Sequence, residues 1–127
     1  MIAPWQEVCV DLIGPWKVQL GNQTIEFRAL TSIDPVTNLT EIIRVENATA
    51  NEVATRFEQS WLARYPRPVR CVHDLGSEFI GFEFQRLLRN NSITDVPTSS
   101  RYPQATSICE HMHQTVGNVL RTLLHVH

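Results

Sequence analysis

The chain has 127 residues, of which 43% are hydrophobic and 19% charged, and its formal net charge at pH 7 is −2. This length predicts one domain with one core, and the composition is too apolar and too weakly charged for a disordered protein. The sequence has neither a run of about 20 apolar residues that would span a membrane nor an N-terminal export signal.

The first third of the chain predicts an antiparallel meander. Apolar and β-branched runs predict three strands, over residues 5–13, 24–33 and 39–45. Turn-forming residues follow the first strand and separate the others, at Gly14-Pro15, Gly21-Asn22 and Asp34-Pro35. The first strand carries one carboxylate, Asp11, in an otherwise apolar run.

Helices and strands alternate in the rest of the chain. Thr49 and Glu52 have the spacing of a capping box, and Val53, Phe57 and Trp61 follow as one apolar stripe. Similar patterns predict a helix over residues 50–64, a strand over 69–73, a helix over 77–89, a strand over 93–97, a loop over 98–104 and a helix from 106.

The predicted order is βββαβαβα. Antiparallel strands followed by alternating helices and strands imply an α/β domain, in which a five-stranded mixed sheet has helices on both faces. We interpret residues 1–127 as this one domain. The last helix is still apolar in pattern at residues 123–124, so we expect the domain's C-terminal helices to be truncated here and the chain to be a fragment of a larger enzyme.

Three carboxylates occupy positions that are typical of catalytic or metal-binding residues. Asp11 interrupts an apolar strand, Asp74 follows the end of another, and Glu110 lies one turn into the last helix. Parallel strands place their carboxyl ends at one edge of a sheet, so the two aspartates can converge there and bind divalent cations such as Mg²⁺. Each acid also has an ordinary reading, as a buried hydrogen-bonded carboxylate, a turn residue or a solvated helix residue.

The cysteines give no comparable signal. Cys9, Cys71 and Cys109 form an odd set without a C-x-x-C spacing, so we expect neither a disulfide framework nor a structural zinc site.

The segments around the three acids resemble one family. Between Asp74 and Glu110 lie 35 residues, which is the D,D(35)E spacing. Four collinear segments carry the resemblance, residues 5–15, 33–37, 73–79 and 103–104 with Glu110 beyond them. Together they are similar to the catalytic core of retroviral-type integrases, especially those of gypsy-type LTR retrotransposons.

The resemblance implies a ribonuclease H-like fold and a Mg²⁺-dependent DNA nucleotidyltransferase, for which Mn²⁺ can substitute. Asp11 would bridge two Mg²⁺ ions, and Asp74 and Glu110 would each hold one. The enzyme would trim the 3′ ends of element DNA and join them to target DNA. It would act in the nucleus or elsewhere inside the cell, on chromosomal double-stranded DNA, as a homo-oligomer in its full-length form.

Four further residues are candidates for contact with DNA. Gln104 lies on the loop before Glu110, and His113, Gln114 and Gly117 share a helix face with Glu110. An ordinary polar helix face explains the last three about as well. With one lysine and a net charge of −2, the chain is a poor general DNA binder, although two divalent ions would raise that charge to about +2.

Two departures from the family pattern bear on activity. Leu75 stands where family members often have Asn after the second acid. Thr106-Ser107 stands where Asn-Gly is frequent, and without that glycine the loop over the site is expected to be stiffer.

Two other functions remain open: a ribonuclease H-like nuclease that only hydrolyses, and a domesticated or decayed core that serves as an interaction module.

Overall fold

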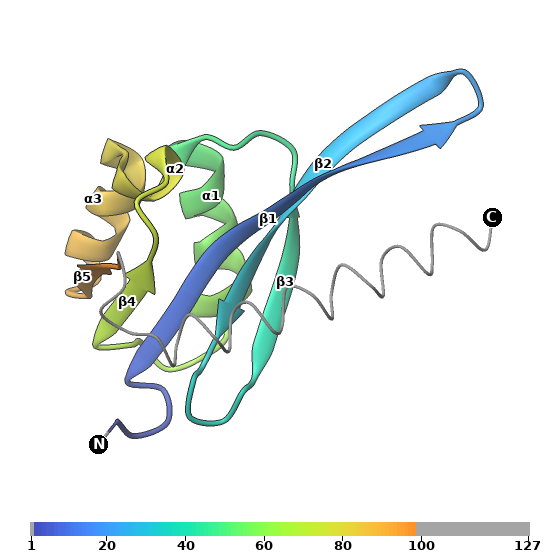
Figure 1. Ribbon diagram of the computed structural model, residues 1–127. Coiled ribbons are helices and arrows are strands. Elements are labelled where there is room, and N and C mark those ends of the chain that lie inside the picture. The colour runs from blue at the N-terminus through green and yellow to red at the C-terminus, as the bar shows by residue number, and fades with distance from the viewer. Residues whose placement is uncertain (1, 99–127) are drawn as a thin grey trace.

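Five strands and a set of short helices make up residues 2–98, the part of the chain that this computed structural model describes (Figure 1). The strands are β1 (Glu7–Leu20), β2 (Gln23–Ile33), β3 (Thr40–Val45), β4 (Arg70–His73) and β5 (Thr94–Pro97). The helices are α1 (Ala50–Phe57), the π-helical η1 (Glu58–Leu62), α2 (Ser77–Ile80) and α3 (Phe82–Asn90). This order confirms the prediction up to β5, and the expected helix from residue 106 lies outside the described residues.

The strands form one mixed sheet in the order β3-β2-β1-β4-β5. β1 pairs with β2 antiparallel and with β4 parallel, while β5 pairs with β4 parallel and β3 with β2 antiparallel. The meander and the later crossovers therefore share one sheet, as predicted. Within the described part of the chain the helices pack on one face of this sheet, as Figure 1 shows.

The core lies between that face and the helices. Its largest fully buried side chains include Trp61, Phe57, Phe79 and Phe84, and β1 contributes Val8 and Val10. Trp5 packs at the edge of the same cluster. Residues that alternate with these along the strands lie on the opposite face, where Cys9 and Val72 form a smaller cluster.

The predicted N-cap and apolar stripe of the first helix are present, but the capping box is only half formed, because the Thr49 backbone N–H donates to the Asn47 carbonyl oxygen and not to Glu52. Thr49 Oγ1 accepts a hydrogen bond from the Glu52 backbone N–H at 3.2 Å. Val53, Phe57 and Trp61 are at most 1% exposed. The Glu52 carboxylate accepts bonds from the backbone N–H groups just before the cap, and so fixes the approach of the chain from β3.

The predicted helix over residues 77–89 is two helices, α2 and α3. The break is at Gly81, whose backbone is extended (φ −67°, ψ 158°). A Cβ at this position would lie 2.5 Å from the Cβ of Ala50, at the start of α1. Glycine is needed here because the chain passes directly against α1. The periodicity of the apolar residues does not predict this contact.

The sequence predicted that the first strand ends before Gly14 and Pro15, but β1 continues past them. The strand continues to Leu20, with a shift in its pairing to β2 between Ile13 and Trp16. Gly14 adopts a positive φ of +103° at this bulge, after which Trp16 pairs with Phe27 and the hairpin continues (Figure 1). Gly14 and Pro15, residue types that often end strands, therefore form a bulge within β1.

We expect Gly14→Ala to destabilise the fold by about 1–3 kcal/mol, because a Cβ at this positive φ would also lie 3.1 Å from the Trp16 ring and 3.3 Å from the Phe27 carbonyl oxygen. Gly21→Ala is the matched control. Gly21 also has a positive φ, +62°, but its added Cβ meets open space, so the loss should be about 1 kcal/mol. Urea titration of both variants measures the difference, and equal losses would contradict crowding at the bulge.

The turn between β2 and β3 is confirmed. Asp34 Oδ1 accepts a hydrogen bond from Val36 N–H at 2.9 Å and its Oδ2 accepts one from Thr37 Oγ1 at 3.1 Å. Asn38 takes the left-handed conformation, with φ +63°. Asp34 therefore has the turn-forming role that the sequence indicates.

Two of the cysteines lie in the described residues. Cys9 and Cys71 are buried thiols, and burial raises the pKa of Cys71 well above its usual value. Among residues 2–98 the structure contains no helix with the length and apolarity that a membrane crossing requires.

Candidate active site

The parallel pairing of β1 with β4 brings Asp11 and Asp74 together. The register runs from Glu7 opposite Arg70 to Cys9 opposite Val72. Asp11 and Asp74 each lie two residues beyond this last pair. Asp11 is still inside β1, opposite Thr31 of β2, whereas β4 ends at His73, so Asp74 lies just beyond the carboxyl end of its strand. This is the edge of an α/β sheet where sites form.

The two carboxylates interact strongly. The pKa of Asp11 is raised from its usual 3.8 to about 7, chiefly by partial burial and then by the negative charge of Asp74. A side-chain hydrogen bond with Asp74 and the charge of Glu78 raise this pKa further, while a 2.8 Å hydrogen bond from Leu12 N–H lowers it. Carboxylates that crowd each other in this way hold either a shared proton or a cation.

The loop after β4 shapes the solvent side of the pair. Asp74 is exposed, and its Oδ1 accepts a hydrogen bond from Gly76 N–H at 2.8 Å. A Cβ on Gly76 would lie 2.5 Å from Glu78 Oε1 and 3.0 Å from Asp74 Oδ1. A side chain at this position would therefore displace the flexible end of Glu78 and press against the Asp74 carboxylate.

Glu78 is an acid beside the pair that is not among the three predicted from the sequence. The residue lies in α2, and its charge acts on Asp11 while its carboxylate lies against Gly76 beside Asp74. Its spacing of four residues from Asp74 is a signal in the sequence, but an acid in the first turn of a helix also favours that helix without any role in a site.

The other predicted site residues lie outside the described part of the chain. They are Glu110, which would complete the triad, and Gln104, His113, Gln114 and Gly117, the candidates for DNA contact. Within residues 2–98 no group of three or more His, Cys, Asp or Glu side chains is arranged to hold a metal ion. Asp11 and Asp74 offer two hard oxygen donors, which suits Mg²⁺ or Mn²⁺ and leaves coordination positions for further ligands.

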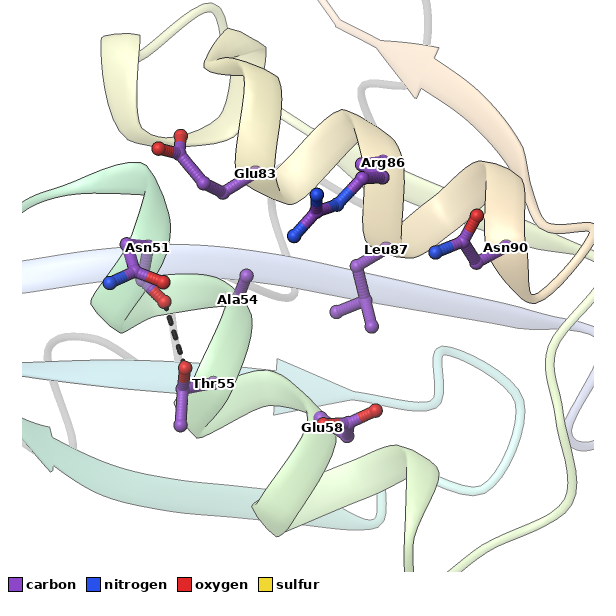
Figure 2. Close-up of a pocket in the computed structure, with 8 residues that line it drawn as sticks. All are labelled: Asn51, Ala54, Thr55, Glu58, Glu83, Arg86, Leu87 and Asn90. Atoms are coloured by element: carbon purple, nitrogen blue, oxygen red, sulfur yellow. Dashed lines mark hydrogen bonds between the residues drawn. The ribbon is translucent and has the colours of Figure 1, made fainter.

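A separate pocket lies between α1 and α3, and Figure 2 shows its lining. The lining residues are mostly polar: Asn51, Ala54, Thr55, Glu58, Glu83, Arg86, Leu87 and Asn90. The Thr55 hydroxyl donates to the Asn51 carbonyl at 3.0 Å across one turn of α1. This pocket contains none of the acids described above and is not the candidate active site.

Comparison by sequence finds a transposon polyprotein. The chain is 25% identical over 121 residues to the Retrovirus-related Pol polyprotein from transposon 412 of Drosophila melanogaster. The match covers 94% of this chain and about a tenth of that polyprotein. No family model matches the chain.

Comparison by structure finds integrases. The catalytic core of BIV integrase matches with a TM-score of 0.68 and 18% identity, over 87% of this chain and 65% of that one. The HTLV-2 integrase catalytic core, solved in complex with magnesium in a dimeric form, matches with a TM-score of 0.76 and 16% identity, over 95% and 73%. A chain of the simian T-cell lymphotropic virus intasome, solved in complex with PP2A regulatory subunit B56 gamma, matches with a TM-score of 0.78 and 16% identity, over 94% of this chain and 41% of that one.

These comparisons confirm the resemblance to integrase catalytic cores and the ribonuclease H-like fold. They agree with the sheet itself, in which an antiparallel meander is followed by two parallel strands. The chain thus has the fold of integrase catalytic cores, with the expected five-stranded mixed sheet.

Proposed function

We propose that this chain is the catalytic core of a retroelement integrase, which trims the 3′ ends of element DNA and joins them to target DNA in a reaction that depends on Mg²⁺. The observation that carries the proposal is the adjacency of Asp11 and Asp74, with the pKa of Asp11 raised to about 7 partly by its neighbour. Sites for divalent cations bring carboxylates together in this way, against their mutual repulsion.

Asp11, Asp74 and Glu110 are the proposed catalytic residues and metal ligands. Two bound Mg²⁺ ions would activate the attacking oxygen and stabilise the leaving one. The chain's own part is to hold the ligands. The pairing of β1 with β2 and β4 fixes Asp11, and the hydrogen bond from Gly76 N–H fixes Asp74 Oδ1. The magnesium in the solved HTLV-2 integrase core supports this choice of metal.

The proposed partner is double-stranded DNA, from both the element ends and the target. Gln104, His113, Gln114 and Gly117 are proposed to contact it. A homo-oligomer is proposed for the full-length protein, of which this chain would be the core domain, because the HTLV-2 core has dimeric and trimeric forms. Such a protein would act on chromosomal DNA, in the nucleus or elsewhere inside the cell.

A joining assay tests the proposal directly. The 127-residue chain is incubated with a DNA duplex that ends in a free 3′-hydroxyl, a circular target and Mg²⁺ or Mn²⁺. We expect a covalent product that joins the two DNAs and requires the metal. Shortened DNA without joined product would instead favour a ribonuclease H-like nuclease. If calorimetry also detects no metal binding, the interaction-module function is favoured.

A further inference from the structure

His73, the last residue of β4, is buried and immediately precedes Asp74 in the chain. Its side chain is completely excluded from solvent. The imidazole stacks on Phe79 with ring centroids 5.4 Å apart and meets the edge of Phe84 at 6.0 Å. Two aromatic rings thus fix the orientation of a polar ring that has no access to water, so its nitrogens need partners within the protein.

Both imidazole nitrogens have such partners. Nδ1 lies 2.5 Å from the backbone carbonyl oxygen of Asp74, and Nε2 contacts Asp95 Oδ1. A carbonyl oxygen can only accept, so Nδ1 carries a proton and donates it to Asp74.

Asp95 is itself held in place. It lies in β5, where its backbone is opposite Cys71 of β4. Gln85 of α3 donates from Nε2 to Asp95 Oδ1 at 3.1 Å and to the Phe79 carbonyl oxygen at 2.9 Å. The chain of hydrogen bonds therefore runs from α3 through Asp95 and His73 to the peptide that follows Asp74.

The peptide that precedes Asp74 is fixed as well. The His73 carbonyl oxygen accepts a hydrogen bond from Thr98 N–H at 2.7 Å and another from Thr98 Oγ1 at 3.2 Å. Both peptide planes that flank the Asp74 Cα are thus held, and together they determine φ and ψ of Asp74 and the direction of its Cα–Cβ bond. This matters because Asp74 lies beyond the end of β4, where strand pairing no longer holds it.

We propose that His73 and Asp95 are positioning residues that hold Asp74 in the geometry for metal binding. This inference rests on the proposed function. Groups behind metal ligands commonly change metal affinity by about 10- to 100-fold when they are removed. Here the hydrogen bonds act on the backbone of the ligand instead of its carboxylate, which stays free for the ion.

The test measures Mn²⁺ affinity of the full chain by calorimetry, together with thermal stability. Asp95→Leu keeps the size of the side chain and removes the partner of His73 Nε2, and we expect it to weaken Mn²⁺ binding by about tenfold or more. Asp95→Asn should stay within about threefold of wild type. Its amide N–H can donate to Nε2 while Nδ1 keeps its bond to Asp74, so the variant loses the hydrogen bond from Gln85, which shares Asp95 Oδ1 with His73, but keeps a partner for both imidazole nitrogens.

Tyr65→Phe is the matched control for a merely structural effect. Tyr65 donates a hydrogen bond to the Glu41 carboxylate of β3, at the opposite edge of the sheet from β5. Its removal also breaks a link to a carboxylate, so we expect a loss of stability without any change in Mn²⁺ affinity.

Gln85→Met decides the result if Asp95→Leu does not fold, because it removes only the outer hydrogen bonds of the same chain. A loss of Mn²⁺ affinity of about threefold or more supports the inference. If Asp95→Leu, or Gln85→Met in its place, loses stability as Tyr65→Phe does but binds Mn²⁺ as wild type does, the positioning role is wrong. Failure of the wild-type chain to bind Mn²⁺ would instead count against the proposed function itself.

Discussion

Asp11→Asn is expected to abolish DNA joining and, at the same time, to stabilise the fold above pH 7. The first effect follows from the loss of a negative ligand that would bind both metal ions, with almost no change in volume. We expect the rate of joining to fall by at least about a thousandfold. Product formation under saturating Mn²⁺, measured on a gel against wild type, gives the ratio.

The gain in stability follows from the raised pKa of Asp11. Between about pH 4 and pH 7 the folded protein binds more protons at this residue than the unfolded chain does, since its pKa moves from 3.8 to about 7 on folding. The free energy of unfolding of wild type therefore falls as the pH rises through this range. Asparagine does not titrate, so Asp11→Asn removes this dependence, and without metal at pH 8 it should be more stable by on the order of 2 kcal/mol.

Glu26→Gln is the control, since Glu26 is a half-exposed carboxylate on the β1–β2 hairpin whose contact with Arg28 is a loose 4.0 Å. It should change neither joining nor the pH dependence of unfolding. Urea unfolding of all three proteins at pH 5 and pH 8 gives the comparison. An Asp11→Asn variant that is less stable than wild type at pH 8 would show that Asp11 is an ordinary structural carboxylate.

Phe84→Ala is expected to be the most destabilising single change, at about 3–5 kcal/mol. Phe84 is fully buried where α3 meets α1, with its ring 5.7 Å from Phe57 and 5.3 Å from Phe79. It also closes one side of the His73 ring. Alanine would leave a cavity between α3 and the residues behind the acid pair, which close packing prevents from collapsing fully.

Phe82→Ala is the matched control, because Phe82 lies two residues earlier in the same helix and is 63% exposed. Its ring has a cation–π contact with Arg86 and is otherwise largely exposed. The change should therefore lower the free energy of unfolding by no more than about 0.5 kcal/mol. Urea denaturation distinguishes the two. Equal, small losses in both variants would contradict the position of Phe84 in the core.

The sequence was sufficient to predict the order of the strands and the pairing of two acids because both depend on local pattern. Asp11 in an apolar strand and Asp74 after a short one are readable along the chain, and the parallel crossover then brings them to one edge. The contacts that were missed join residues far apart in sequence. Gly81 breaks a helix because it passes Ala50, and the bulge at Gly14 depends on pairing with a second strand.

The contact of His73 with Asp95 was equally hidden. A buried histidine and an acid 22 residues later in the chain carry no periodic signal, and only the parallel register of β4 and β5 brings them together. Sequence patterns therefore pointed to Asp11 and Asp74 but not to the groups that hold them, because acids in unusual positions stand out by their chemistry and supporting groups are found only by contact.

The continuation of β1 through the bulge provides a site for a fluorescent label at the tip of the β1–β2 hairpin. The hairpin extends past the sheet in Figure 1 and ends at the exposed Gly21 and Asn22. Leu20, at 58% exposure, lies nine residues along the strand from Asp11, or about 30 Å at the usual rise per residue. A fluorophore attached at Asn22 would thus report by energy transfer on a labelled DNA end as it arrives, without touching the acids.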